Sequence, residues 1–300
     1  MTGVAPRVTA ADRARFIEQG YIAVPDVVPA DYCERVIEAM CAFIGVDHRD
    51  PSAWSRYPKQ GHGIVPLHHH QALWDVRQLP VVHDVFSALY GTEKLWVSQD
   101  RVSFKIPSRL IPNGFRMDPP HWDGDPRLAF ANAGAAQAAS ARNPGAAPRD
   151  RALAMQGLVY LTDTPAAKGA FAMVPDLYRS LAEWLATPRS DEEIRRPDVS
   201  QFALEPVPGA RGTLVVWNRL MAHTSLANDT DEPRLVQYVT MTPARDDASA
   251  EREANVKNCL EKHPPFWALR QKVPGQLDPE PGPPVVLTAL GRKLVGIDAW

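Results

Sequence analysis

Two histidines and one aspartate carry the clearest chemistry in this chain. His121 and Asp123 lie two residues apart, so on a β-strand their side chains leave the same face and can reach one ion. His223 follows much later, after a strand-like segment at residues 212–218 and a short turn. Two imidazoles and one carboxylate form the facial set of ligands that binds non-haem Fe(II) and leaves coordination positions open. We therefore predict that His121, Asp123 and His223 are the metal ligands and the catalytic residues.

Arg234 is the second feature that points to chemistry. A His-x-Asp pair alone is weak evidence, because most isolated matches are strand ends with a hydrogen-bonded histidine and a surface aspartate. Arg234 opens a strand-like segment, residues 234–242, soon after His223. Two open positions on the metal can chelate the 2-oxo acid end of 2-oxoglutarate, and the third remains for dioxygen. The guanidinium fork of Arg234 can then hold the far carboxylate with two hydrogen bonds in a buried pocket.

Short strands must bring these residues together, and the middle of the chain supplies them. Segments rich in β-branched and aromatic residues, separated by Pro and Gly, occur at residues 95–106, 154–161, 170–174, 202–207, 213–217 and 234–242. Many short strands in series favour an antiparallel sandwich or jelly roll, so we expect a mainly β fold with added helices. Residues 128–151 are rich in Ala, Gly, Pro and Asn, which predicts a mobile lid or surface loop.

Helices are expected before and after this β region. Capping patterns and apolar stripes predict three N-terminal helices that end at Gly20, Gly45 and Gly91, and Thr9 with Asp12 resembles a capping box for the first. We expect one domain over residues 1–300, with its parts as follows: an N-terminal helical region at 1–92, a jelly-roll core at 93–245 and a C-terminal extension at 246–300 that docks on the body.

The sequence resembles the phytanoyl-CoA dioxygenase-like family of Fe(II)/2-oxoglutarate-dependent oxygenases. The resemblance rests on four elements that occur in the order and spacing of the family: residues 16–27, the His121-Trp122-Asp123 element, residues 169–175, and His223 with Arg234. It covers nearly the whole chain. It implies a double-stranded β-helix (a cupin-like jelly roll) with N-terminal helices, and Fe²⁺ and 2-oxoglutarate as cofactors.

One departure from the family concerns the 2-oxoglutarate anchor. Relatives often carry Ser or Thr two residues after the arginine, whereas this chain has Val236. Another side chain must therefore help Arg234, and we consider Gln99, Ser103 and Lys105, which share one face of the strand-like segment 95–106. These residues are candidate cofactor-binding groups.

His68, His69 and His70 form a competing candidate metal site. Three consecutive side chains alternate on a strand or splay on a loop, so they rarely converge on one ion. We therefore favour structural or substrate-loop roles for these histidines. Trp122 lies between two predicted ligands and should point away from them, as a packing residue.

Composition excludes several classes of partner. A formal charge of -2 and a pI near 6.5 give no basic footprint for nucleic acid or an anionic membrane. Cys33, Cys41 and Cys259 make an odd number without metal-site spacing, which favours a reducing compartment, and no apolar run is long enough to span a bilayer. We expect a cytoplasmic protein whose partners are a small-molecule substrate and dioxygen.

Three functions remain in competition at this point. The first is a dioxygenase that hydroxylates an unactivated C–H bond and releases succinate and CO2; halogenation is disfavoured because Asp123 fills the position that halide would need. The second is a cupin-like isomerase or hydrolase with zinc or manganese at the same ligands. The third is a non-catalytic binding scaffold with the same fold.

Overall fold

The computed structural model describes residues 7–54, 63–111, 116–131, 154–265 and 282–300. Most of the predicted lid at residues 128–151 lies outside the described residues, so its mobility stays a prediction. In the described part of the chain, no helix combines the length and the apolar character that crossing a membrane would need.

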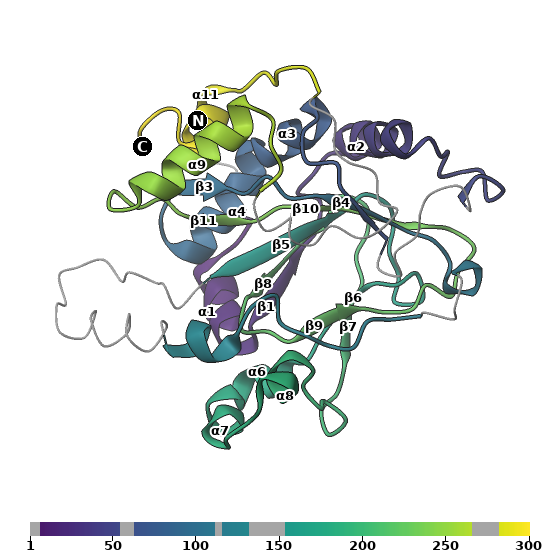
Figure 1. Cartoon of the computed structure of the whole chain (residues 1–300), viewed down its shortest axis with the longest axis vertical. Coiled ribbons are helices and arrows are strands. Elements are labelled where there is room, and N and C mark those ends of the chain that lie inside the picture. Colours follow the sequence, from purple (N-terminus) through teal and green to yellow (C-terminus); the bar gives the residue numbers. More distant parts are fainter. Residues whose placement is uncertain (1–6, 55–62, 112–115, 132–153, 266–281) are drawn as a thin grey trace.

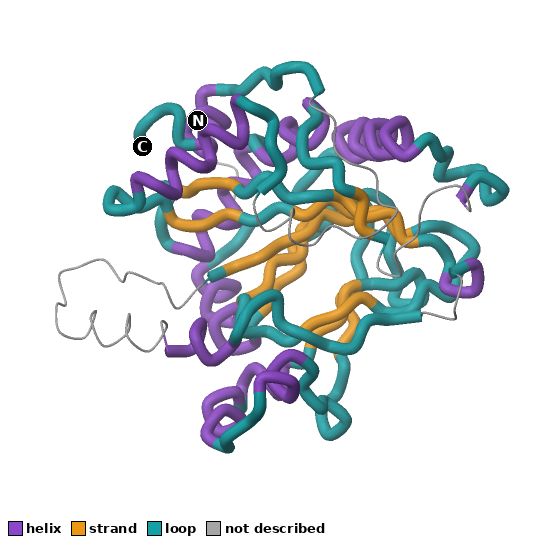
Figure 2. The backbone as a smooth tube through the Cα atoms, viewed as in Figure 1, coloured by secondary structure: helices purple, strands orange, loops and turns teal. Residues whose placement is uncertain are grey.

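Two antiparallel sheets form the centre of the molecule (Figures 1 and 2). The major sheet has the order β1 (Tyr21–Val24), β8 (Leu214–Asn218), β5 (Met155–Tyr160), β10 (Arg234–Tyr238), β4 (Val102–Lys105) and β2 (Ile64–Val65). The minor sheet has the order β7 (Glu205–Val207), β6 (Phe171–Met173) and β9 (His223–Ser225), and a separate pair joins β11 (Met241–Pro243) to β3 (Leu95–Val97). In both sheets, strands that are far apart in the sequence lie next to each other, and this arrangement is the expected jelly roll.

Helices cover the outer side of the major sheet and one end of the minor sheet (Figure 1). The first group comprises α1 (Ala10–Gln19), α2 (Ala30–Ile44), α3 (Gln71–Arg77), α4 (Pro80–Tyr90), α9 (Ser249–Leu260) and α11 (Ala289–Val295). The second comprises α6 (Pro175–Arg179), α7 (Leu181–Ala186) and α8 (Asp191–Arg195), and a short 3-10 turn, η2 (Ser108–Leu110), follows β4. The expected docking of the C-terminal segment is confirmed, because Leu294 and Val295 are buried in the main core.

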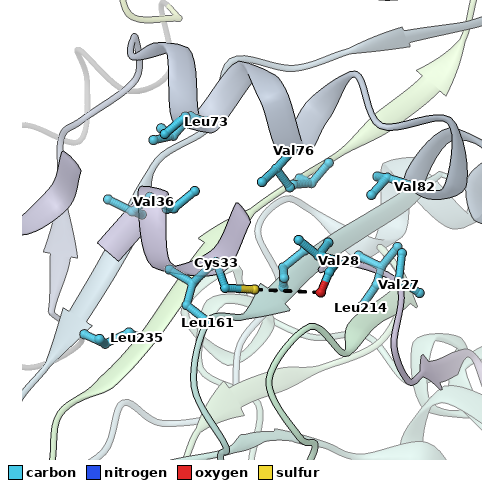
Figure 3. Close-up of a cluster of buried hydrophobic side chains, with 14 of the residues drawn as sticks. Val27, Val28, Cys33, Val36, Leu73, Val76, Val82, Leu161, Leu214 and Leu235 are labelled. Carbon is cyan, nitrogen blue, oxygen red and sulfur yellow. Dashed lines mark hydrogen bonds between the residues drawn. The ribbon is translucent and has the colours of Figure 1, made fainter. Parts of the chain in front are cut away.

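The strands alternate between two cores. Side chains such as Leu214 and Leu235 face outward and pack with Cys33 and Val36 of α2 and Leu73 of α3, as Figure 3 shows. Their neighbours face the space between the sheets, where Leu158, Val215, Trp217 and Val236 form a second cluster with Phe171 and Met173 of the minor sheet. This two-residue period decides which side chains reach the interior of the jelly roll.

The helix ends agree with the predicted signals. Thr9 and Asp12 make the capping box of α1, and α1, α2 and α4 end at Gly20, Gly45 and Gly91, each with a left-handed φ that glycine tolerates best.

Two predicted strands are each divided in two, and the one expected at residues 202–207 is reduced to β7. Segment 95–106 divides into β3 and β4, and segment 234–242 into β10 and β11. The region at 1–92, expected to be helical, also contributes β1 and β2 to the major sheet.

Candidate metal centre

The structure brings the three predicted ligands to one point. His223 begins β9, and residue 121 forms an isolated antiparallel bridge with it through two backbone hydrogen bonds of 3.0 Å. One ligand atom from each of His121, Asp123 and His223 lies within 4.8 Å of the others, in the part of the chain that the structure describes. The Nε2 atoms of His121 and His223 lie 3.9 and 3.5 Å from the Asp123 carboxylate oxygens.

Backbone carbonyls orient both imidazoles toward this point. The Nδ1 atom of His121 lies 3.0 Å from the Pro119 carbonyl oxygen, and that of His223 lies 2.9 Å from the Met221 carbonyl oxygen. A carbonyl only accepts, so each Nδ1 must carry the hydrogen and each Nε2 keeps a lone pair. Two neutral Nε2 donors and one carboxylate suit a divalent first-row metal with open positions.

Asp123 is held in its anionic form. Its Oδ2 accepts a 2.7 Å hydrogen bond from the side-chain amide of Gln156 on β5. Partial burial raises the pKa of the Asp123 carboxyl, but its interactions with His223 and His121, which a bound metal would replace, and the hydrogen bond from the Gln156 amide hold the pKa well below its usual range. Gln156 was not anticipated from the sequence, although it is a lone polar residue on an apolar strand.

A cavity of about 560 Å³ opens beside the three ligands. Its wall includes Asp100, Arg101, Gln156, Phe171, Trp217 and Tyr238. The rings of Phe171 and Trp217 lie 5.1 and 5.3 Å from the His223 ring, centre to centre. These aromatic groups shield the inner side of the ligand set from water.

Arg234 is fully buried and lacks partners for its charge. It leaves β10 on the same face as Val236 and Tyr238, toward the interior of the jelly roll. Within the described residues, its Nε, Nη1 and Nη2 atoms have no hydrogen-bond partner, and neither does the indole Nε1 of Trp217. A buried guanidinium without an anion costs several kcal/mol of folding free energy, on the order of 3–5. The carboxylate of a bound diacid such as 2-oxoglutarate fits this requirement.

Of the three candidate helpers, the structure brings Lys105 and Ser103 to the interior and takes Gln99 elsewhere. Lys105 pairs in register with Arg234, and Ser103 pairs with Val236. The Lys105 ammonium group is buried and donates to the Leu226 carbonyl at 2.6 Å. The side-chain amide of Gln99 donates to the backbone carbonyl of Asn255 on α9, and this contact gives no support to a cofactor role for Gln99.

The competing histidines have separate structural roles. The His68 Nδ1 lies 3.2 Å from the Gln99 carbonyl, the His69 Nε2 lies 3.0 Å from the Asn258 carbonyl, and His70 caps α3. Burial lowers the pKa of His68 to about 3 and of His69 to about 4, so both are neutral core groups. The expected packing role of Trp122 is confirmed, because its ring is buried against that of Trp184, with the ring centres 5.5 Å apart.

Comparison with known proteins decides the family. A profile of the phytanoyl-CoA dioxygenase family matches residues 16–236. The chain belongs to this family. A phytanoyl-CoA dioxygenase-like protein of Dictyostelium discoideum is 22% identical over 265 residues, which is 76% of this chain and 74% of the relative.

Solved structures agree with this family in their fold. The epimerase SnoN in complex with Fe3+, alpha ketoglutarate and nogalamycin RO has 20% identity and a TM-score of 0.55, over 91% of this chain and 94% of that one. EctD from S. alaskensis with 2-oxoglutarate and 5-hydroxyectoine has 18% identity and a TM-score of 0.51, over 81% and 79%. As a phytanoyl-CoA dioxygenase family member with the His121, Asp123 and His223 set, the chain is an iron- and 2-oxoglutarate-dependent enzyme.

Proposed function

We propose that this chain is an Fe(II)/2-oxoglutarate-dependent dioxygenase that hydroxylates an unactivated C–H bond of a small molecule, with succinate and CO2 as co-products. The observation that carries the proposal is the buried Arg234, whose three side-chain nitrogens have no partner among the described residues, in a jelly roll that also brings three metal ligands together. A metal-dependent hydrolase or isomerase has no need of a buried cation at this place.

Each residue of the site has a distinct task in this reaction. His121, Asp123 and His223 hold the metal, and their backbone and Gln156 contacts fix the orientation of the ligand atoms. Bound there, iron, 2-oxoglutarate and dioxygen supply the oxidising chemistry. Arg234 holds the far carboxylate of 2-oxoglutarate, which aligns the oxo acid end with the metal.

Lys105 adds positive charge beside Arg234. Burial, followed by the charge of Arg234, lowers the pKa of the Lys105 ammonium to about 7. An anion bound between the two groups would restore the charged form, so the lysine assists the arginine. The apolar walls formed by Phe171 and Trp217 keep water away from the reacting atoms.

Hydroxylation is favoured over the other outcomes within this class. Asp123 supplies a protein carboxylate, so no ligand position is free for a halide. EctD is bound to a hydroxylated compound in its structure, whereas SnoN is an epimerase, so the fold serves more than one oxidative outcome. We place the enzyme in the cytoplasm because its three cysteines are free thiols.

Succinate release and substrate mass test the proposal together. The purified protein is supplied with Fe(II), 2-oxoglutarate and air, and candidate small molecules are screened for a gain of one oxygen atom by mass spectrometry. We expect succinate to form in amounts that match the hydroxylated product. A product of unchanged mass but altered stereochemistry would show that the enzyme is an epimerase and not a hydroxylase. A reaction that does not depend on 2-oxoglutarate would overturn the proposal.

A further inference from the structure

The inner face of β4 carries charged side chains at both ends. Arg101 directly precedes β4, and its carbonyl accepts a 3.0 Å hydrogen bond from the Tyr238 backbone, which continues the ladder with β10. The period of two therefore places Arg101, Ser103 and Lys105 on one face. Lys105 lies beside Arg234 at the inner end, and Arg101 lines the cavity at the other end.

One molecule of 2-oxoglutarate cannot reach both ends of this row. Residues 101 and 105 lie four steps apart along the strand, a length of about 13 Å. The four carbon–carbon bonds of 2-oxoglutarate, roughly 1.5 Å each, place its carboxyl carbons about 5 Å apart. If Arg234 and Lys105 hold the far carboxylate and the metal holds the other end, Arg101 is left facing the rest of the cavity.

We propose that the substrate is a small molecule with an oxyanion group, a carboxylate or a phosphate, and that Arg101 binds this group. The inference rests on the proposed function, because it assigns 2-oxoglutarate to the inner cations. The guanidinium is mostly buried, with 15% of the side chain exposed, so a charge-assisted bond made there is shielded from water.

The cavity wall around Arg101 carries charges of both signs. The positive side chains on the wall include Arg195 and Arg196 of the α8 region, each of which lies 3.6 Å from Glu192. The negative side chains on the same wall are those of Asp100, Asp118 and the metal ligand Asp123. Asp100 lies 3.6 Å from the Arg101 Nε, so a bound oxyanion would share the guanidinium with this carboxylate.

Arg77 gives this part of the wall a rigid support. Its guanidinium is fully buried and donates to the carbonyls of His68 at 3.0 Å and Asp100 at 2.5 Å. The Asp100 carboxylate in turn accepts the backbone N–H of Arg101 at 2.7 Å. Arg101 is thus presented by a fixed segment, which is the arrangement that selective recognition of a charged group requires.

The test compares matched charged and neutral compounds. The protein, loaded with Fe(II) and 2-oxoglutarate and kept free of oxygen, is screened by ligand-observed NMR against carboxylic acids paired with their primary amides and phosphate monoesters paired with their alcohols. We expect binders among the charged members with at least a tenfold preference over their neutral partners. Acids alone or phosphates alone would identify the oxyanion. A panel with no charged binder, or with equal binding of neutral partners, would overturn the proposal.

Variants then assign the preference to one residue. Arg101→Gln should abolish the preference and Arg101→Lys should keep part of it, because lysine retains the charge but lacks the fork. Arg245→Gln, at an exposed arginine paired with Glu251 away from the cavity wall, is the matched control and should leave it unchanged. A preference that survives Arg101→Gln in a protein with normal melting would refute the assignment. If the protein binds anions selectively but releases no succinate in air, the proposed function is contradicted while the role of Arg101 in anion binding stands.

Discussion

Two buried arginines offer a sharp test of the 2-oxoglutarate site. Arg77 and Arg234 are both fully buried, but Arg77 donates to two carbonyls, whereas Arg234 has no hydrogen-bond partner among the described residues. Methionine has a similar length and no charge, so Arg77→Met and Arg234→Met remove the guanidinium with little change in packing. In the absence of ligands, we expect the two substitutions to change stability in opposite directions.

The magnitudes follow from the contacts. Arg77→Met loses two charge-assisted hydrogen bonds and leaves their acceptors buried, which should cost about 3 kcal/mol of unfolding free energy. Arg234→Met removes an uncompensated buried charge, which should stabilise the ligand-free protein by about 1–4 kcal/mol. For a chain of this size these changes correspond to shifts of several degrees in melting temperature, down for Arg77→Met and up for Arg234→Met.

Ligand addition should narrow this difference in stability. Saturating 2-oxoglutarate and metal stabilise the wild type in proportion to the logarithm of ligand concentration over Kd. Arg234→Met should lose at least tenfold in 2-oxoglutarate affinity by calorimetric titration while metal affinity is retained, whereas Arg77→Met should keep both. Unchanged 2-oxoglutarate affinity in Arg234→Met, or a ligand-free protein destabilised as much as Arg77→Met, would refute the assignment of Arg234.

The remaining predictions concern the metal ligands and Lys105. Asp123→Ala should abolish iron-dependent succinate formation with little change in ligand-free melting; a folded variant with wild-type turnover would remove Asp123 from the site. Gln156→Leu should weaken metal binding by about 10–100-fold in a metal titration, because the carboxylate loses its orienting donor. For Lys105 the folded pKa, about 7, lies below that of the unfolded chain, so the unfolded state binds more protons and ligand-free stability should rise from pH 7 to pH 10. Over the same range 2-oxoglutarate affinity should fall, and Lys105→Met should remove both trends.

The convergence of His121, Asp123 and His223 could be predicted because it depends on residue type and on a period of two. His121 and Asp123 needed only an extended backbone to share a face, and His223 needed only to begin a neighbouring strand. The inward position of Arg234 follows from the same period on β10. The structure adds the unpartnered state of its side chain, which no sequence pattern could reveal.

The helper Gln99 shows where that period fails. Its assignment assumed unbroken alternation through residues 95–106, but the strand is interrupted between β3 and β4. The interruption turns the Gln99 amide toward Asn255 on α9, a contact across 156 residues of chain. Arg77 lies in a helix whose sequence gives no sign of its contact with Asp100. Such long-range polar contacts depend on how separate elements dock, so only the structure could show them.

The interior of the jelly roll contains more positive charge than folding alone would favour. Arg234 and Lys105 lie side by side in register on β10 and β4, and within the described residues neither forms an ion pair. On the opposite face of the same strands, Leu235 and Phe104 pack in an ordinary apolar core. The outer face therefore stabilises the sheet strongly enough to hold the uncompensated charge of Arg234 and the buried amine of Lys105, whose charged form a bound anion would restore. The folding free energy of the sheet pre-organises the anion site, so ligand binding should recover what the unliganded fold loses.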